Sequence, residues 1–149
     1  MSLFDQVSDD IKAAMLARQK IRLEALRAIK TAFVLAKAET GAESLPPEQE
    51  LKILQKMIKQ RKESADIYKE QNRMDLYQKE VDESAVIEEY LPKQLGEEEI
   101  VRIIKQVIQQ LGASTIKDMG KVMGAAGKEL SGKADNKMVA EKVKELLGG

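Results

Sequence analysis

Three glycines stand close together near the carboxyl-terminal end of the sequence, in a segment whose patterning is otherwise helical. They are Gly120, Gly124 and Gly127, and they fall within eight residues. In a helix interior each glycine costs about 1 kcal/mol relative to alanine, so such a group needs a compensating reason. Close approach of another backbone is one such reason, because a residue without a Cβ leaves room for it.

Lysines accompany these glycines on the same side of the expected helix. At about 100° per residue, one stripe holds Lys117, Lys121, Gly124 and Lys128. Ammonium groups there can reach phosphate oxygens while the glycines let a nucleic-acid backbone come near, an arrangement that fixes position without reading base sequence. The alternative is that the glycines admit a neighbouring helix and that the lysines are ordinary solvated surface. The residues alone leave both interpretations open.

A nucleotide-binding loop is a further interpretation of the same region. Gly127, Gly132 and Lys133 have the glycine and lysine spacing of a phosphate loop. The next residue is Ala134, where such a loop needs a serine or threonine to hold magnesium, and no buried strand precedes the segment. We therefore interpret Gly132 as a helix-terminating turn and expect no cofactor.

Groups suited to catalysis are scarce in this chain. It contains no histidine and no cysteine, which removes the usual general base near neutral pH, the thiolate nucleophile and the commonest transition-metal ligands. The acidic runs at 88–89 and 97–99 consist of sequence neighbours, whose side chains diverge around a helix and make poor acid/base pairs. We expect no catalytic residue and no metal site.

Basic residues also gather near the amino terminus. Between residues 12 and 30 they exceed acidic residues by five, with Glu24 as the single acid against Lys12, Arg18, Lys20, Arg22, Arg27 and Lys30. Further along, the segment 47–71 carries Lys59, Arg61 and Lys62. Aligned surfaces of this kind would form an RNA-contacting groove, whereas the interspersed acids Glu48, Glu50 and Glu63 favour an ordinary solvated face.

The composition predicts an all-α protein. Hydrophobic residues make up 43%, charged residues 34% and aromatic residues only 3%, which suits helices better than strands. Apolar periodicity predicts helices over about 2–17, 21–39, 47–71, 74–90, 97–111, 114–130 and 135–147. Segments 47–71 and 74–90 should form a long antiparallel hairpin.

Specific caps and inner faces follow from this periodicity. We expect Ser114 to cap the helix that carries the three glycines, and Asp135 or Asn136 to cap the last one. The inner face of the first helix should include Val7, Ala14 and Met15. The inner face of segment 74–90 should comprise Met74, Tyr77, Val81, Ala85 and Ile87.

The best domain boundary lies at residues 91–96, which contain a proline and a glycine ahead of a fresh acidic helix start. This divides the chain into an N-terminal helical domain, residues 1–92, and a small C-terminal three-helix domain, residues 93–149. No apolar run reaches membrane-spanning length and no secretory signal is present, so we expect a cytoplasmic protein with no membrane partner.

Several short motifs resemble those of the GatB/YqeY family. They are KQRK at 59–62, Arg73 with Asp75-Leu76, YLP at 90–92, KDMGKVMG at 117–124 and GKAD at 132–135. Asn72 and Asn136 stand where many relatives have glycine. Because asparagine tolerates left-handed backbone geometry, we expect both turns to be kept.

The resemblance implies a role as well as a fold. YqeY-like proteins are similar to the C-terminal tail of the GatB component of aspartyl/glutamyl-tRNA amidotransferase, which helps to hold tRNA while other parts perform the amidation. For this chain it implies a tRNA-binding accessory without catalysis of its own. The residues assigned to RNA are Lys117, Gly120, Lys121, Gly124, Lys128 and Lys133, helped by Lys59, Arg61 and Lys62.

Two other functions remain as alternatives. In the first, the glycine face is a docking site for a protein partner in translation or tRNA aminoacylation, which would make the chain a helical adaptor. The second is a component of a glutamine-dependent carbon–nitrogen ligase that amidates Glu-tRNA or Asp-tRNA. The chain is too short to hold the catalytic parts of that enzyme, so such an activity would belong to a complex.

Overall fold

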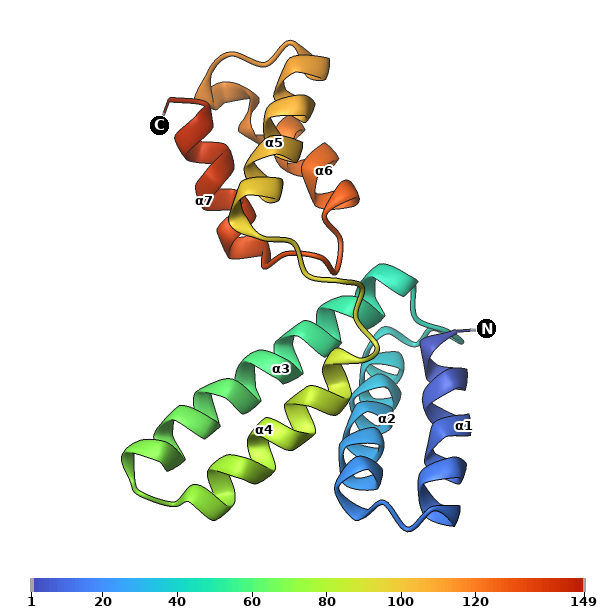
Figure 1. Ribbon diagram of the computed structural model, residues 1–149. Coiled ribbons are helices and arrows are strands. Elements are labelled where there is room, and N and C mark those ends of the chain that lie inside the picture. Colours follow the sequence, from blue (N-terminus) through green and yellow to red (C-terminus); the bar gives the residue numbers. More distant parts are fainter. Residues whose placement is uncertain (1, 149) are drawn as a thin grey trace. The chain divides into compact units, whose positions relative to one another are not determined.

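The computed structural model describes residues 2–148, and every regular element in that range is helical. The helices are α1 Leu3–Leu16, α2 Lys20–Thr40, α3 Pro47–Glu70, α4 Met74–Glu88, α5 Glu97–Leu111, α6 Met119–Glu129 and α7 Asn136–Leu146 (Figure 1). A short 3-10 turn, η1 Ile116–Asp118, precedes α6. The expected all-α class is confirmed. No helix in the described part of the chain is long and apolar enough to cross a membrane.

The chain separates into two compact units between Leu91 and Pro92. The first unit contains α1 to α4 and the second contains α5 to α7. Each unit has its own cluster of buried apolar side chains.

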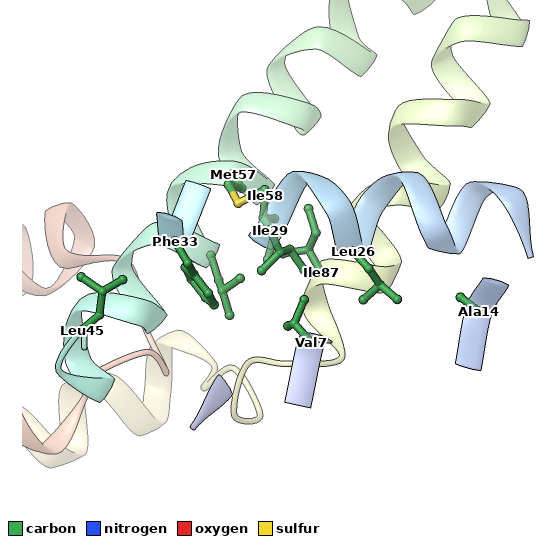
Figure 2. Packing of buried hydrophobic residues seen from close by; sticks show 10 residues of the cluster. Val7, Ala14, Leu26, Ile29, Phe33, Leu45, Met57, Ile58 and Ile87 are labelled. Atoms are coloured by element: carbon green, nitrogen blue, oxygen red, sulfur yellow. The ribbon is translucent and has the colours of Figure 1, made fainter. Parts of the chain in front are cut away.

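Helix α2 supplies the centre of the first core. Its side chains Leu26, Ile29 and Phe33 are fully buried, and they meet Val7 of α1 and Ile87 of α4 (Figure 2). The apolar residues of α2 recur at helical spacing, so a single face of this helix packs against its neighbours. The core is therefore built mainly from aliphatic side chains around one phenylalanine.

Helices α3 and α4 pack against each other and are joined by the turn at residues 71–73. Asn72 adopts a φ of 61° there, which confirms the expectation that asparagine replaces glycine in this turn. The same expectation is wrong for Asn136. That residue is the first of α7 and lies outside the left-handed region, because Asp135 caps the helix by accepting a hydrogen bond from the Lys137 amide.

The inner face of α4 differs from the expected one. Met74 is 50% exposed and Val81 37% exposed, whereas Glu83 and Ser84 are buried beside Ile87. The carboxylate of Glu83 faces Arg61 of α3, which partly compensates for its burial. The expectation for Met15 of α1 is also wrong, since its side chain is 53% exposed at the end of the helix.

In the second unit, α5 to α7 enclose a core of aliphatic side chains. Ile104, Val122 and Val143, one from each helix, are fully buried. The spacing of Ile100, Ile104 and Val107 along α5 gives that helix a clear apolar face. The unit is thus a small structure in which each helix contributes one face to the core.

Two leucines in the first unit provide a test of this packing. Leu26 is fully buried and Leu16 is 87% exposed. We expect Leu26→Ala to lower the free energy of unfolding by about 2–5 kcal/mol, because it leaves a cavity in the core. Leu16→Ala should change it by less than about 0.5 kcal/mol. Urea denaturation followed by circular dichroism measures both, and equal effects would contradict the described core.

Candidate functional site

A capping box fixes the start of the segment that carries the three glycines. The Thr115 side chain and the Asp118 carboxylate cap η1 reciprocally, and Asp118 Oδ2 accepts hydrogen bonds from the amides of Ser114 at 3.1 Å and Thr115 at 3.3 Å. These amide donors hold the pKa of Asp118 below its usual value. The cap is therefore Thr115, and the expectation of Ser114 is wrong.

This cap places Lys117 outside α6. Lys117 lies in η1, and α6 begins two residues later at Met119. A 3-10 turn advances by about 120° per residue, so the regular helical spacing that put Lys117 on the stripe does not apply there. The side chain is exposed just before the amino-terminal end of α6.

On α6 itself, Lys121, Gly124 and Lys128 share one exposed face. The opposite face carries the buried Val122 and Ala126. Lys121 and Lys128 are seven residues apart, which corresponds to about 10 Å along the helix axis. The α6 surface formed by Lys121, Gly124 and Lys128 thus presents two ammonium groups on either side of a position without a side chain.

All three glycines of α6 face open space. A Cβ built on Gly120, Gly124 or Gly127 meets no atom of another part of the described chain within 4 Å. Among the described residues of the second unit, therefore, no neighbouring helix makes use of their small size. The interpretation that they admit another helix of the second unit is therefore wrong, and the glycines are open to solvent.

Lys133 lies in the loop between α6 and α7, beside Gly132 with its φ of 72°. Two hydrogen bonds attach this loop to the start of the unit. Gln94 Nε2 donates to the Gly132 carbonyl at 2.6 Å, and the Leu95 amide donates to the Lys133 carbonyl at 2.9 Å. The Lys133 side chain is exposed, so its backbone is anchored while its ammonium group faces solvent.

The four lysines around α6 are exposed, and none of them forms an ion pair with any described residue: Lys117, Lys121, Lys128 and Lys133. Lys142 of α7 differs, because its Nζ lies 2.5 Å from Glu97 and 3.6 Å from Glu145. Within this unit, the cations around α6 are thus available to an external anion, whereas Lys142 is held by the unit's own acids.

The structure separates the three long-helix cations by environment. Lys59 is exposed and forms no ion pair with the described residues. Arg61 Nε lies 3.7 Å from Glu83 Oε2, and Lys62 Nζ lies 3.2 Å from Glu88 Oε1. Burial raises the pKa of Glu83, and the charge of Arg61 opposes that shift.

Sequence reasoning missed these pairs across α3 and α4, although one signal was present. Arg61 and Glu83 are each 11 residues from Asn72, so folding the two helices about that turn brings them opposite each other. Arg61 and Lys62 therefore both pair with acids of α4, and only the Arg61–Glu83 pair is largely shielded from solvent. Lys59 is the residue of the three that is left facing solvent.

The first unit contains a small recess. A recess of about 160 Å³ lies between α3 and α4, and both apolar residues such as Ala65 and Val81 and charged residues line it. The charged lining residues are Arg61, Lys62, Glu80 and Glu88. Over residues 2–148, no three acidic side chains come together in an arrangement that could hold a metal ion. The recess thus contains charges of both signs, and two of its lining residues, Lys62 and Glu88, pair with each other.

Comparison with known proteins gives one family and two fungal relatives. The family model described as Yqey-like protein matches residues 4–147. A protein of Pyrenophora tritici-repentis is 29% identical over 144 residues, covering 93% of this chain and 77% of that protein. A protein of Clavispora lusitaniae is 29% identical over 133 residues, covering 87% of this chain and 75% of that protein. Both are named Altered inheritance of mitochondria protein 41, mitochondrial.

The open glycines make a stability prediction. Gly124→Ala should raise the free energy of unfolding by about 0.5–1 kcal/mol, because the added Cβ meets only solvent and reduces the freedom of the unfolded chain. Gly112→Ala is the matched control. Its Cβ also meets open space, but its φ of 63° strains alanine, so this variant should be less stable. Thermal or urea unfolding distinguishes them, and a destabilised Gly124→Ala would show that the glycine is needed for the fold.

Proposed function

Because this chain belongs to the family of YqeY-like proteins, we propose that it is an accessory module that binds tRNA and performs no catalysis of its own. In this proposal the hairpin-containing N-terminal domain and the three-helix C-terminal domain have separate tasks, with RNA binding centred on the latter. The observation that carries the proposal is the α6 surface, where the glycines are open and the lysines form no ion pair with the described residues.

The chemistry of the α6 surface fits a phosphate backbone. Lysine is a compact cation that binds phosphate as a point charge, and its position along a rigid helix fixes where each phosphate sits. Gly120, Gly124 and Gly127 lower the surface between the lysines, so a bulky sugar–phosphate chain can lie against the helix. Such interactions supply affinity that depends on salt and is independent of base sequence.

The other predicted residues take secondary positions in this proposal. Lys133 extends the cationic surface beyond the end of α6, and Lys117 extends it before the start. Lys59 would add an interaction from the first unit, while Arg61 and Lys62 serve first as partners of α4 acids. We place this activity in the cytoplasm, as one part of a larger assembly when amidation is involved.

The salt dependence of tRNA binding tests the proposal. Changing Lys117, Lys121 and Lys128 together to alanine should weaken binding at least about tenfold at low salt. It should also reduce the slope of log K against log salt by about 2 to 3, close to one unit for each phosphate that is no longer neutralised. Fluorescence anisotropy with labelled tRNA over a salt series measures both quantities.

A charge-matched triple variant controls this experiment. Lys105, Lys137 and Lys144 lie on α5 and α7, are exposed, and form no ion pair with the described residues. Changing these three to alanine removes the same charge from the same unit and should leave most of the binding. Equal losses in both triple variants would mean that the α6 surface is not the site, and an unmodified chain without tRNA affinity would refute the function.

The open glycines also favour a second function, a protein-interaction adaptor. A partner helix could pack closely over Gly124, in the way that small residues allow backbones to approach. In that case Gly124→Leu should abolish capture of the partner from RNase-treated cells, while the lysine triple variant captures it normally. If instead both variants lose tRNA and neither loses a protein partner, the adaptor function is rejected.

A further inference from the structure

The connection between α1 and α2 exposes three large apolar side chains. Leu16 is 87% exposed, Met15 53% and Ile21 42%, and all three fall within seven residues. Single exposed apolar residues are ordinary on protein surfaces, but a group of them at one turn indicates an interaction site. Neither α1 nor α2 needs these side chains for its own packing, because the first core is formed by other faces of the two helices.

The same turn is strongly cationic. Residues 11–23 contain four basic residues and no acidic one. Lys12, Arg18 and Lys20 are exposed and form no ion pair in the part of the chain that the structure describes, whereas Arg22 is paired with Glu89 at 2.5 Å. Three available cations therefore lie in the same short stretch of chain as the apolar side chains. We refer to Lys12, Met15, Leu16, Arg18, Lys20 and Ile21 together as the α1–α2 knuckle.

Backbone hydrogen bonds hold the knuckle in a defined conformation. The Ala17 and Gln19 amides donate to the carbonyls of Ala13 and Ala14, both at 3.0 Å, and Arg18 takes a left-handed φ of 55°. Within the first unit the turn lies at the end of the α1–α2 pair, away from the amino terminus (Figure 1). Leu16 thus stands beside a turn of defined conformation and is 87% exposed.

We propose that the α1–α2 knuckle binds reversibly to the surface of a bilayer containing anionic phospholipids. Leu16 and Met15 enter between the headgroups, and Lys12, Arg18 and Lys20 approach the lipid phosphates. Attachment of this kind needs an apolar tip with cationic flanks and no spanning helix. This proposal differs from the expectation of no membrane partner, which rested on the length of apolar runs. It does not depend on the α6 surface.

The combination of groups favours a bilayer over other anionic partners. RNA would engage the cations but would leave the apolar side chains in water. An acidic protein would need a hollow shaped to receive Leu16, whereas the acyl region of a bilayer accepts any protruding apolar group. Because charge and apolar burial act together at a membrane surface, both sets of knuckle residues should be needed.

Vesicle co-sedimentation of the full chain tests this proposal. The chain should bind vesicles of phosphatidylglycerol and phosphatidylcholine, and not vesicles of phosphatidylcholine alone. Changing Met15 and Leu16 to serine should reduce the partition coefficient at least about fivefold, since serine has no apolar group to insert. Changing Lys12, Arg18 and Lys20 to glutamine should reduce it on the order of 100-fold at low salt.

Matched controls separate this surface from the rest of the molecule. Leu111→Ser alters another exposed leucine, and the Lys105, Lys137 and Lys144 triple change to glutamine removes equal charge from the second unit; both should bind like the unmodified chain. Circular dichroism checks that all variants fold. Absence of binding to anionic vesicles, or equal losses in the control variants, overturns the proposal. The proposal is also overturned if the knuckle variants change self-association or lose tRNA binding while their vesicle binding is unchanged.

Discussion

Helix α4 places the carboxylate of Glu83, which is poorly exposed to solvent, next to Arg61 of α3. This helix is rich in acids, and four ion pairs bind it and its C-cap to α2 and α3: Arg22–Glu89, Lys79–Glu24, Arg61–Glu83 and Lys62–Glu88. Exposed pairs of this kind contribute little, but the side chains of Arg61 and Glu83 are only 17% and 11% exposed, so removing either partner would leave a poorly solvated charge.

Helical periodicity was sufficient for the class of fold and for most inner faces. The faces of α2 and α5 follow from the spacing of aliphatic residues alone, since nothing polar competes for their interior. The face of α4 could not be predicted in this way, because it includes the charged residue Glu83. Glu83 is buried opposite Arg61, which lies 22 residues away in the sequence. Periodicity counts apolar residues and does not register a carboxylate whose burial depends on another helix.

For the candidate site, the sequence predicted the shared face of α6 but not the position of Lys117. Spacing correctly placed Lys121, Gly124 and Lys128 on one face of α6, because that segment is a regular helix. It misplaced Lys117, since the Thr115 cap starts a 3-10 turn rather than α6. Whether the glycines were covered depended on tertiary packing, which no single-sequence pattern contains. Their openness removes one interpretation of the motif, in which a neighbouring helix of the second unit covers the glycines.

The glycines also shape the dynamics of the second unit. With three glycines in 11 residues, α6 has a lower intrinsic helical preference than α5 or α7, and only its packed face holds it in place. Its amide hydrogens should exchange with solvent through local opening more readily than those of α5, as the weakest segment of a small domain does. A partner lying along α6 would suppress that opening. Hydrogen exchange would therefore register occupancy of this helix even where the bound and free structures are the same.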